Sequence, residues 1–157
     1  MSFSAHPLWL VGFRPFFALA CLSGLSLPIL WALIFTGVLT PPSAAFSANQ
    51  WHAHEMFFGF GWAVLGGFLL TSTKNWVSIR GYHGAALMYL VAAWLFERLG
   101  MWCGGSWPKF LFLISNNIFL VSIVLMLLWT LISHRKDDSY RSDNRFFLIA
   151  LPLYLVA

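Results

Sequence analysis

The stretch that decides the fold runs from Trp51 to Leu70: WHAHEM (51–56), followed by FFGFGWAVLGGFLL (57–70). The second part is wholly apolar and predicts a membrane-spanning helix. The first part places two imidazoles, a carboxylate and a thioether directly before it. Because ionisable side chains are expensive in hydrocarbon, their position at the start of such a helix indicates a functional site. Histidine and methionine are ligands for haem iron and copper rather than for calcium or magnesium.

The composition of the whole chain predicts an integral membrane protein. Of 157 residues, 60% are hydrophobic and only 9% are charged, and the mean hydropathy is +0.77. Soluble domains carry about 25% charged residues, so this chain has too few to cover itself with polar surface. The net charge of +4 does not indicate nucleic-acid binding, because the Lys and Arg residues lie between apolar runs and form no basic face. We therefore expect a lipid bilayer, and no nucleic acid, as a partner.

Four apolar runs approach the length of about 20 residues that a membrane-spanning helix needs. They are residues 15–39, 54–72, 84–102 and 110–133. A fifth run, 146–157, is too short to span. Since a helix that stopped halfway would leave backbone carbonyls without partners in lipid, we expect the chain to be the N-terminal part of a longer protein. The predicted fold is an all-α membrane protein, a single helical domain over 1–157 with four transmembrane helices and a truncated fifth.

The distribution of basic residues predicts the orientation in the membrane. Because Lys and Arg in short loops favour the cytoplasmic side, we place the N-terminus in the cytoplasm. This orientation leaves only Arg98 and Lys109 on the outer side. The inner side then holds the other basic residues, Arg14, Lys74, Arg80, Arg135, Lys136, Arg141 and Arg145. His52 and His54 then lie near the outer surface, which in a bacterium is the periplasmic side.

Helical geometry separates the two histidines. At about 100° per residue, positions i and i+2 point about 160° apart, so one regular helix cannot direct both His52 and His54 at one ion. Either they serve different partners, or His52 lies in the preceding loop and turns back, or both are interfacial residues bonded to backbone or water. The small residues Gly59, Ala63 and Gly67 form a separate stripe, which predicts the close approach of another helix.

Several short motifs resemble the N-terminal signatures of the NnrS family. In chain order they are Gly12-Phe13-Arg14-Pro15-Phe16-Phe17, Trp51-His52-Ala53-His54-Glu55-Met56, Gly59-Phe60, Gly67-Phe68-Leu69-Leu70-Thr71 and Asn75-Trp76. Members of this family are multi-pass proteins of the bacterial inner (cytoplasmic) membrane, associated with haem, copper and tolerance of nitric oxide and nitrosative stress. The resemblance implies a haem- and copper-binding membrane protein of this response, whose remaining helices would pack against this chain.

A looser likeness, to haem–copper oxidases, bears on the ligands. These enzymes carry an axial haem histidine at the outer start of their second span, followed by aromatic residues, a glycine pair and an asparagine. The corresponding residues here are His54, Phe57, Phe58, Gly66, Gly67 and Asn75. By this analogy His54 is the axial haem ligand, and His52 with Met56, one turn apart, is the alternative site for copper.

Glu55 and Arg98 should lie at similar depth, because the second and third spans are expected to be antiparallel neighbours. We expect the two side chains within about 4 Å, as an ion pair. In the competing interpretation, Arg98 neutralises a haem propionate and Glu55 accepts a hydrogen bond from a ligating histidine. A function of another class also remains open, a multi-pass transporter or channel whose His and Glu side chains line the path. No nucleophile–base pair is recognisable, so the sequence leaves undecided whether the protein is an enzyme.

Overall fold

The computed structural model describes residues 6–40, 46–134, 144–153 and 155, and all the regular structure in these ranges is helical. In chain order the elements are η2 (Pro7–Trp9), α1 (Phe13–Phe35), α2 (Ala48–His54), η3 (Glu55–Gly61), α3 (Trp62–Trp76), α4 (Ala85–Cys103), η4 (Gly104–Ser106), α5 (Lys109–Ser133) and α6 (Arg145–Leu153). Four helical spans are long and apolar enough to cross a membrane: Phe13–Phe35, Ala48–Trp76, Ala85–Ser106 and Lys109–Ser133. The predicted all-α, multi-pass membrane fold is therefore confirmed.

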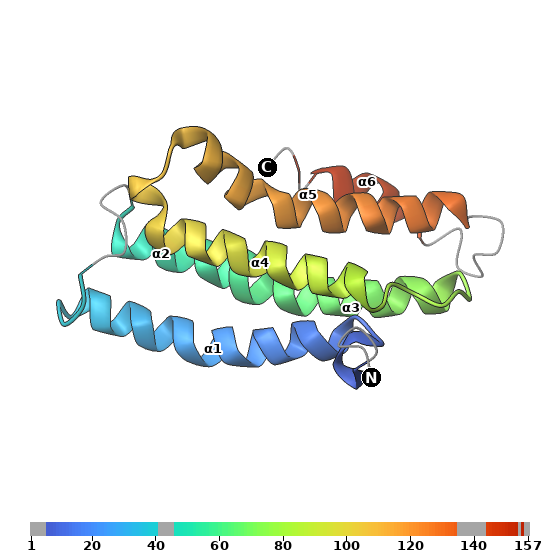
Figure 1. Cartoon of the computed structure of the whole chain (residues 1–157), viewed down its shortest axis with the longest axis horizontal. Coiled ribbons are helices and arrows are strands. Elements are labelled where there is room, and N and C mark those ends of the chain that lie inside the picture. Colours follow the sequence, from blue (N-terminus) through green and yellow to red (C-terminus); the bar gives the residue numbers. More distant parts are fainter. Residues whose placement is uncertain (1–5, 41–45, 135–143, 154, 156–157) are drawn as a thin grey trace.

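The long helices run side by side along the longest axis of the molecule (Figure 1). α1 packs mainly on α3 and η3, α4 packs mainly on α5, and α6 lies against α5. The start of α1 and the end of α3 meet at one end of the bundle, where the Phe13 N–H donates to the Thr71 hydroxyl at 3.1 Å. We call this end, which carries Lys74 and Arg80, the basic end. The opposite end, which carries His52 and His54, is the histidine end.

The second span begins earlier than the sequence predicted, at Ala48 rather than His54. Ser47 and Gln50 form a capping box: the Ser47 hydroxyl accepts from the Gln50 N–H at 3.3 Å, and the Gln50 side chain accepts from the Ser47 N–H at 2.9 Å. As a result both histidines lie within the helix. His52 is not in a loop, which removes one of the three alternatives left by the sequence.

The first span ends earlier than predicted, at Phe35 rather than at residue 39. Gly37 follows with a φ of +76°, in the left-handed region that glycine adopts without steric cost. The Val38 N–H then returns to the Leu33 carbonyl at 2.9 Å. The helix therefore ends just before Gly37, although the apolar residues Val38 and Leu39 continue the hydrophobic run past its end.

The fifth run forms α6, which is described as far as Leu153. Three of the basic residues used to predict the orientation, Arg135, Lys136 and Arg141, lie outside the described residues. The cytoplasmic placement of the N-terminus stays a prediction.

The central core is apolar and is shared by four helices. Side chains with at most 2% exposure include Phe16 from α1, Trp62 from α3, Leu90 from α4 and Ile123 from α5. The outward faces are apolar too, as shown by Leu25, which is 67% exposed. Apolar side chains on both faces are typical of helices surrounded by lipid.

Candidate functional site

The helix that carries the candidate ligands changes its winding at the site. α2 ends at His54, and the next seven residues, η3, form a π-helix before α3 continues to Trp76. π-helical turns inside α-helices are rare and often occur at functional sites. Glu55 and Met56 are the first two residues of this π-helix.

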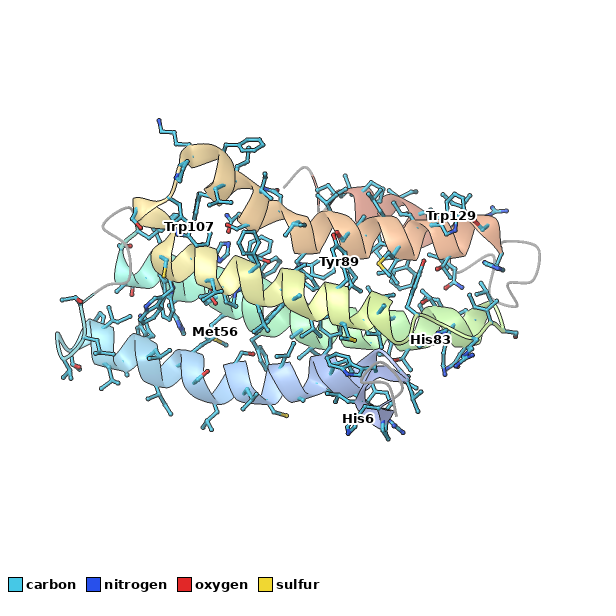
Figure 2. All side chains as sticks on the ribbon, in the orientation of Figure 1. His6, Met56, His83, Tyr89, Trp107 and Trp129 are labelled. Atoms are coloured by element: carbon cyan, nitrogen blue, oxygen red, sulfur yellow. The ribbon has the colours of Figure 1, made fainter. Side chains whose placement is uncertain are left out.

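His52 faces α1. Its ring stacks on Trp31, with centroids 4.7 Å apart and planes at 25°. Its Nδ1 atom is buried and has no hydrogen-bond partner among the described residues. Met56, one turn later, packs against the apolar cluster of Leu27, Ile34, Trp51 and Met101, and Figure 2 shows it between α1 and the rest of the bundle.

His54 faces α4 and two carboxylates. Its Nδ1 lies 3.5 Å from Glu55 Oε1, and its Nε2 lies 4.0 Å from Glu97 Oε1. The ring centroid is 4.8 Å from that of Phe58. The two histidines therefore contact different partners, which is one of the alternatives that the sequence left open.

Arg98 lies between the two carboxylates. Its Nε is 3.0 Å from Glu55 Oε2 and its Nη2 is 2.6 Å from Glu97 Oε1, which confirms the predicted pairing of Glu55 with Arg98. The two contacts go to different carboxylates, so they are two separate ion pairs rather than a bidentate fork on one carboxylate. The guanidinium carbon also lies 5.1 Å from the centre of the Trp94 ring, in a cation–π contact.

A glycine makes room for this cluster. A Cβ atom at Gly59 would lie 2.8 Å from Arg98 Nη1 and 3.2 Å from Glu55 Oε2, so no larger residue fits without a shift. The Trp94 indole N–H donates to the Gly59 carbonyl at 3.1 Å, which joins η3 directly to α4. Ala63 is fully buried, and a Cβ at Gly67 would lie 2.9 Å from Phe16 of α1. The predicted small-residue stripe thus faces neighbouring helices.

A comparison with models of protein families identifies the family of this chain. The family model described as "NnrS protein" matches residues 7–157, a range that includes every helix of the described structure. The chain belongs to the NnrS family. Neither the curated proteins nor the solved structures give a match. With its four apolar spans, this NnrS-family chain is a multi-pass membrane protein.

The structure adds Glu97, a residue that the sequence analysis of this NnrS-family chain did not assign to the site. Its side chain is 1% exposed and contacts both Arg98 and His54. The signal was present, because a carboxylate inside an apolar run indicates function as strongly as an arginine does. Because successive residues of a helix point about 100° apart, the sequence gave no reason to place both Glu97 and Arg98 on the side of Glu55.

The candidate metal ligands do not form one compact site within this chain. Across the described ranges, no three His, Cys, Asp or Glu side chains are grouped so as to hold a metal ion. His52 and Met56 face the α1 side, whereas His54 faces Glu97 of α4. The two histidines thus lie on different sides of the second span.

Proposed function

We propose that this NnrS-family protein binds haem and copper at the histidine end of its bundle, as part of the response to nitric oxide and nitrosative stress. Its location would be the inner (cytoplasmic) membrane of a bacterium. The observation that carries the proposal is that the Nδ1 atom of His52 is buried without a hydrogen-bond partner among the described residues. The Nδ1 atom of His54 lies 3.5 Å from Glu55 Oε1, so its Nε2 is the ring nitrogen that would bind a metal. Buried polar atoms normally have a partner, and a ring nitrogen left without one is suited to binding a metal.

The two histidines would take different roles. His54 is the proposed axial haem ligand, with Glu55 as the acceptor that orients its ring. His52 and Met56, on the α1 side, are the proposed copper ligands, a pairing of imidazole and thioether that suits that metal. Haem iron or copper bound there would supply redox and small-gas-binding chemistry.

Among the residues proposed to contact the cofactor, Arg98 is the one that the geometry supports least, because it is already paired with Glu55 and Glu97. A haem propionate would have to compete for its charge with two carboxylates at 3.0 and 2.6 Å. The ion pair with Glu55 accounts for the buried arginine without a cofactor. Contact with a propionate would therefore require an exchange of partners.

The test is the visible spectrum and copper content of the purified protein. Loss of the haem Soret band in His54→Ala, and of copper in His52→Ala and Met56→Leu, is the expected result. His83→Ala is the matched control, because His83 is an exposed histidine near the basic end whose Nδ1 lies 3.0 Å from the Gly81 carbonyl. A colourless and copper-free wild-type protein, or a Soret band that survives the change at His54, would contradict the proposal.

A second candidate, a transporter or channel, is favoured by the buried charges. Glu55, Glu97 and Arg98 come together inside two apolar spans, and ionisable groups in such places line substrate or ion paths in many membrane proteins. Solute flux into liposomes that contain metal-free protein would support this function. A flux that is unchanged by Glu97→Gln would count against it.

A further inference from the structure

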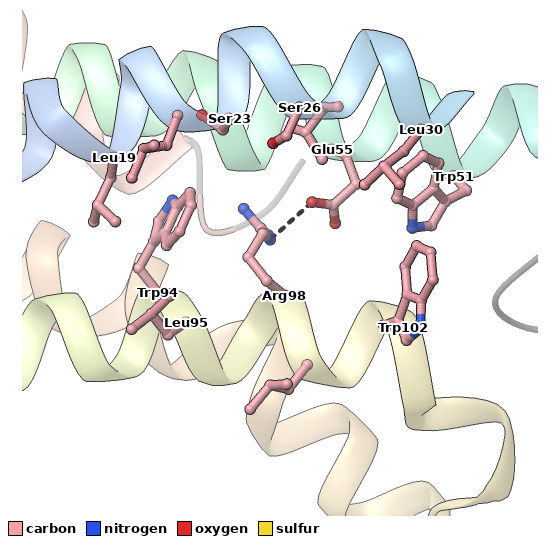
Figure 3. A pocket seen from close by; sticks show the side chains of 13 residues that line it. Leu19, Ser23, Ser26, Leu30, Trp51, Glu55, Trp94, Leu95, Arg98 and Trp102 are labelled. Carbon is pink, nitrogen blue, oxygen red and sulfur yellow. Dashed lines mark ion pairs between the residues drawn. The ribbon is translucent and has the colours of Figure 1, made fainter. Parts of the chain in front are cut away.

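An open pocket of about 490 Å³ lies between α1 and α4 at the histidine end (Figure 3). Leu22 of α1 and Leu99 of α4 lie on its walls and are 64% and 57% exposed. In a membrane-spanning bundle such exposed apolar side chains face lipid, so the pocket opens toward the hydrocarbon. A ligand would enter it from the bilayer rather than from water.

Aromatic side chains stand on both sides of the pocket. Figure 3 shows Trp94 on one side of Arg98, with Trp51 and Trp102 on the other. The rings of Trp51 and Trp102 meet edge to face, with centroids 5.8 Å apart and planes at 72°. Apolar walls with large aromatic rings and a few polar groups are typical of sites for small, flat molecules.

The polar side chains of the pocket include the charged pair Glu55 and Arg98 and the hydroxyls of Ser23 and Ser26. Arg98 Nη1 and Glu55 Oε1 are both buried, and neither has a hydrogen-bond partner among the described residues. One is a donor and the other is an acceptor. A headgroup that accepts one hydrogen bond and donates another would satisfy both, and leaving such atoms unsatisfied carries a free-energy cost.

The charge at this place selects against anionic headgroups. Glu55 and Glu97 bring two carboxylates to the single guanidinium of Arg98, so these three groups together carry excess negative charge when ionised. Like charges repel strongly at low dielectric, which disfavours the phosphate of a phospholipid or the carboxylate of a fatty acid. The ligand should have a neutral headgroup and an apolar tail.

We propose that the pocket between α1 and α4 binds a lipid-soluble quinone or quinol. The ring would lie between the tryptophans, a carbonyl oxygen would accept from Arg98, and a quinol hydroxyl would donate to Glu55. The isoprenoid or alkyl tail would leave along Leu22 and Leu99 into the bilayer. Neither His52 nor His54 lines the pocket, but Glu55 belongs both to this pocket and to the proposed haem site, where it would orient His54.

Photolabelling locates the site. The protein, in nanodiscs of phosphatidylcholine, would be irradiated with an azido-benzoquinone that carries a decyl tail, and the adducts mapped by mass spectrometry. Adducts confined to residues 19–30, 51–55 and 94–102, and prevented by excess decyl-benzoquinone, are expected. Adducts spread over all lipid-facing helices would overturn the proposal.

Matched variants test the pocket without touching its charged groups. Leu22→Trp fills the pocket, whereas Leu25→Trp adds the same side chain to an equally exposed position of α1 that does not line it. Saturable labelling should weaken about tenfold or more in the first variant, and stay within about twofold of wild type in the second. Equal labelling of both variants would contradict the assignment.

A comparison of headgroups separates a quinone site from a place for lipid tails. Decylbenzene has the tail and the ring of decyl-benzoquinone but no oxygen atoms. Because it forms no hydrogen bond with Arg98, it should compete about tenfold or more less well against the photolabel on the wild-type protein. If it competes equally well, the pocket accepts any hydrocarbon, and the quinone proposal is wrong.

Discussion

The two ends of the bundle use glycine for different purposes. Toward the basic end, glycines let apolar side chains approach: an added Cβ would lie 2.6 Å from Leu70 at Gly12, and 2.7 Å from Ile123 at Gly66. At the histidine end, a Cβ at Gly59 would meet the guanidinium of Arg98 instead. The same small residue thus allows the close approach of apolar side chains at Gly12 and Gly66 and makes room for a buried charge at Gly59.

This difference indicates which end carries the function. Apolar contacts between helices stabilise the bundle and need no other explanation. Buried carboxylates, an arginine and two histidines do not favour folding in lipid, and they occur together only at the histidine end of the described chain. Imperfect packing and buried polar atoms without hydrogen-bond partners are expected at functional sites.

The largest effect is expected from topology, since a reporter is either inside or outside. A fusion after Arg141 should report the cytoplasm, and a fusion within residues 43–50 should report the outer side. The reason is the excess of Lys and Arg in the loops of the basic end. Alkaline phosphatase and fluorescent-protein reporters give the measurement. The reverse pattern would place the histidine end, with every proposed ligand, on the cytoplasmic side.

The next largest effect concerns the charges at the histidine end. Arg98→Gln should cost about 3–5 kcal/mol of unfolding free energy, because it leaves two buried carboxylates unpaired. Glu55→Gln should cost less, because Arg98 keeps Glu97 at 2.6 Å. Unfolding in mixed micelles gives the measurement.

Because Glu97 also contacts Arg98, a change at Glu55 does not leave the arginine without a partner, whereas a change at Arg98 leaves both carboxylates unpaired. Adding Glu55→Gln or Glu97→Gln to Arg98→Gln should recover part of the loss, since each removes one unpaired charge. Equal costs for Arg98→Gln and Glu55→Gln would mean that Glu97 does not share the arginine.

A smaller effect on stability is expected from a change in the small-residue stripe of Gly59, Ala63 and Gly67. Ala63→Leu should cost about 1–3 kcal/mol, because Ala63 is fully buried and the larger side chain has no space. Ala92→Leu is the matched control, at an exposed position of α4, and should change the unfolding free energy by less than about 0.5 kcal/mol. If both variants were as stable as wild type in bilayers, the stripe would face lipid and the contrast between the two ends would fail.

The smallest effect is expected at the contact that joins η3 to α4. Trp94→Phe removes the hydrogen bond to the Gly59 carbonyl and weakens the cation–π contact with Arg98, so a loss of about 1–2 kcal/mol is expected. Trp129→Phe, at a tryptophan that is 70% exposed, is the control and should have little effect on thermal unfolding. A loss of similar size in both would show that the indole of Trp94 has no special role.

Local sequence features predicted a large part of this structure. Hydropathy located four spans, the spacing of Gly59, Ala63 and Gly67 predicted a packed face, and antiparallel neighbours predicted the pair of Glu55 and Arg98. Two signals were present but unused: the capping box at Ser47 and Gln50, and the glycine after the first span. Both of these unused signals depend on residues close together in the chain.

The sequence by itself determined that the chain is an all-α membrane protein with four apolar spans, because hydrophobicity and helical period are properties of each segment alone. Only the tertiary structure decided that Glu97 shares Arg98, that His52 stacks on Trp31 while His54 faces α4, and that a pocket opens between α1 and α4. These contacts depend on the rotation and depth of each helix relative to the others. Both are set by the simultaneous packing of several helices and by the π-helical turn, which no single segment specifies.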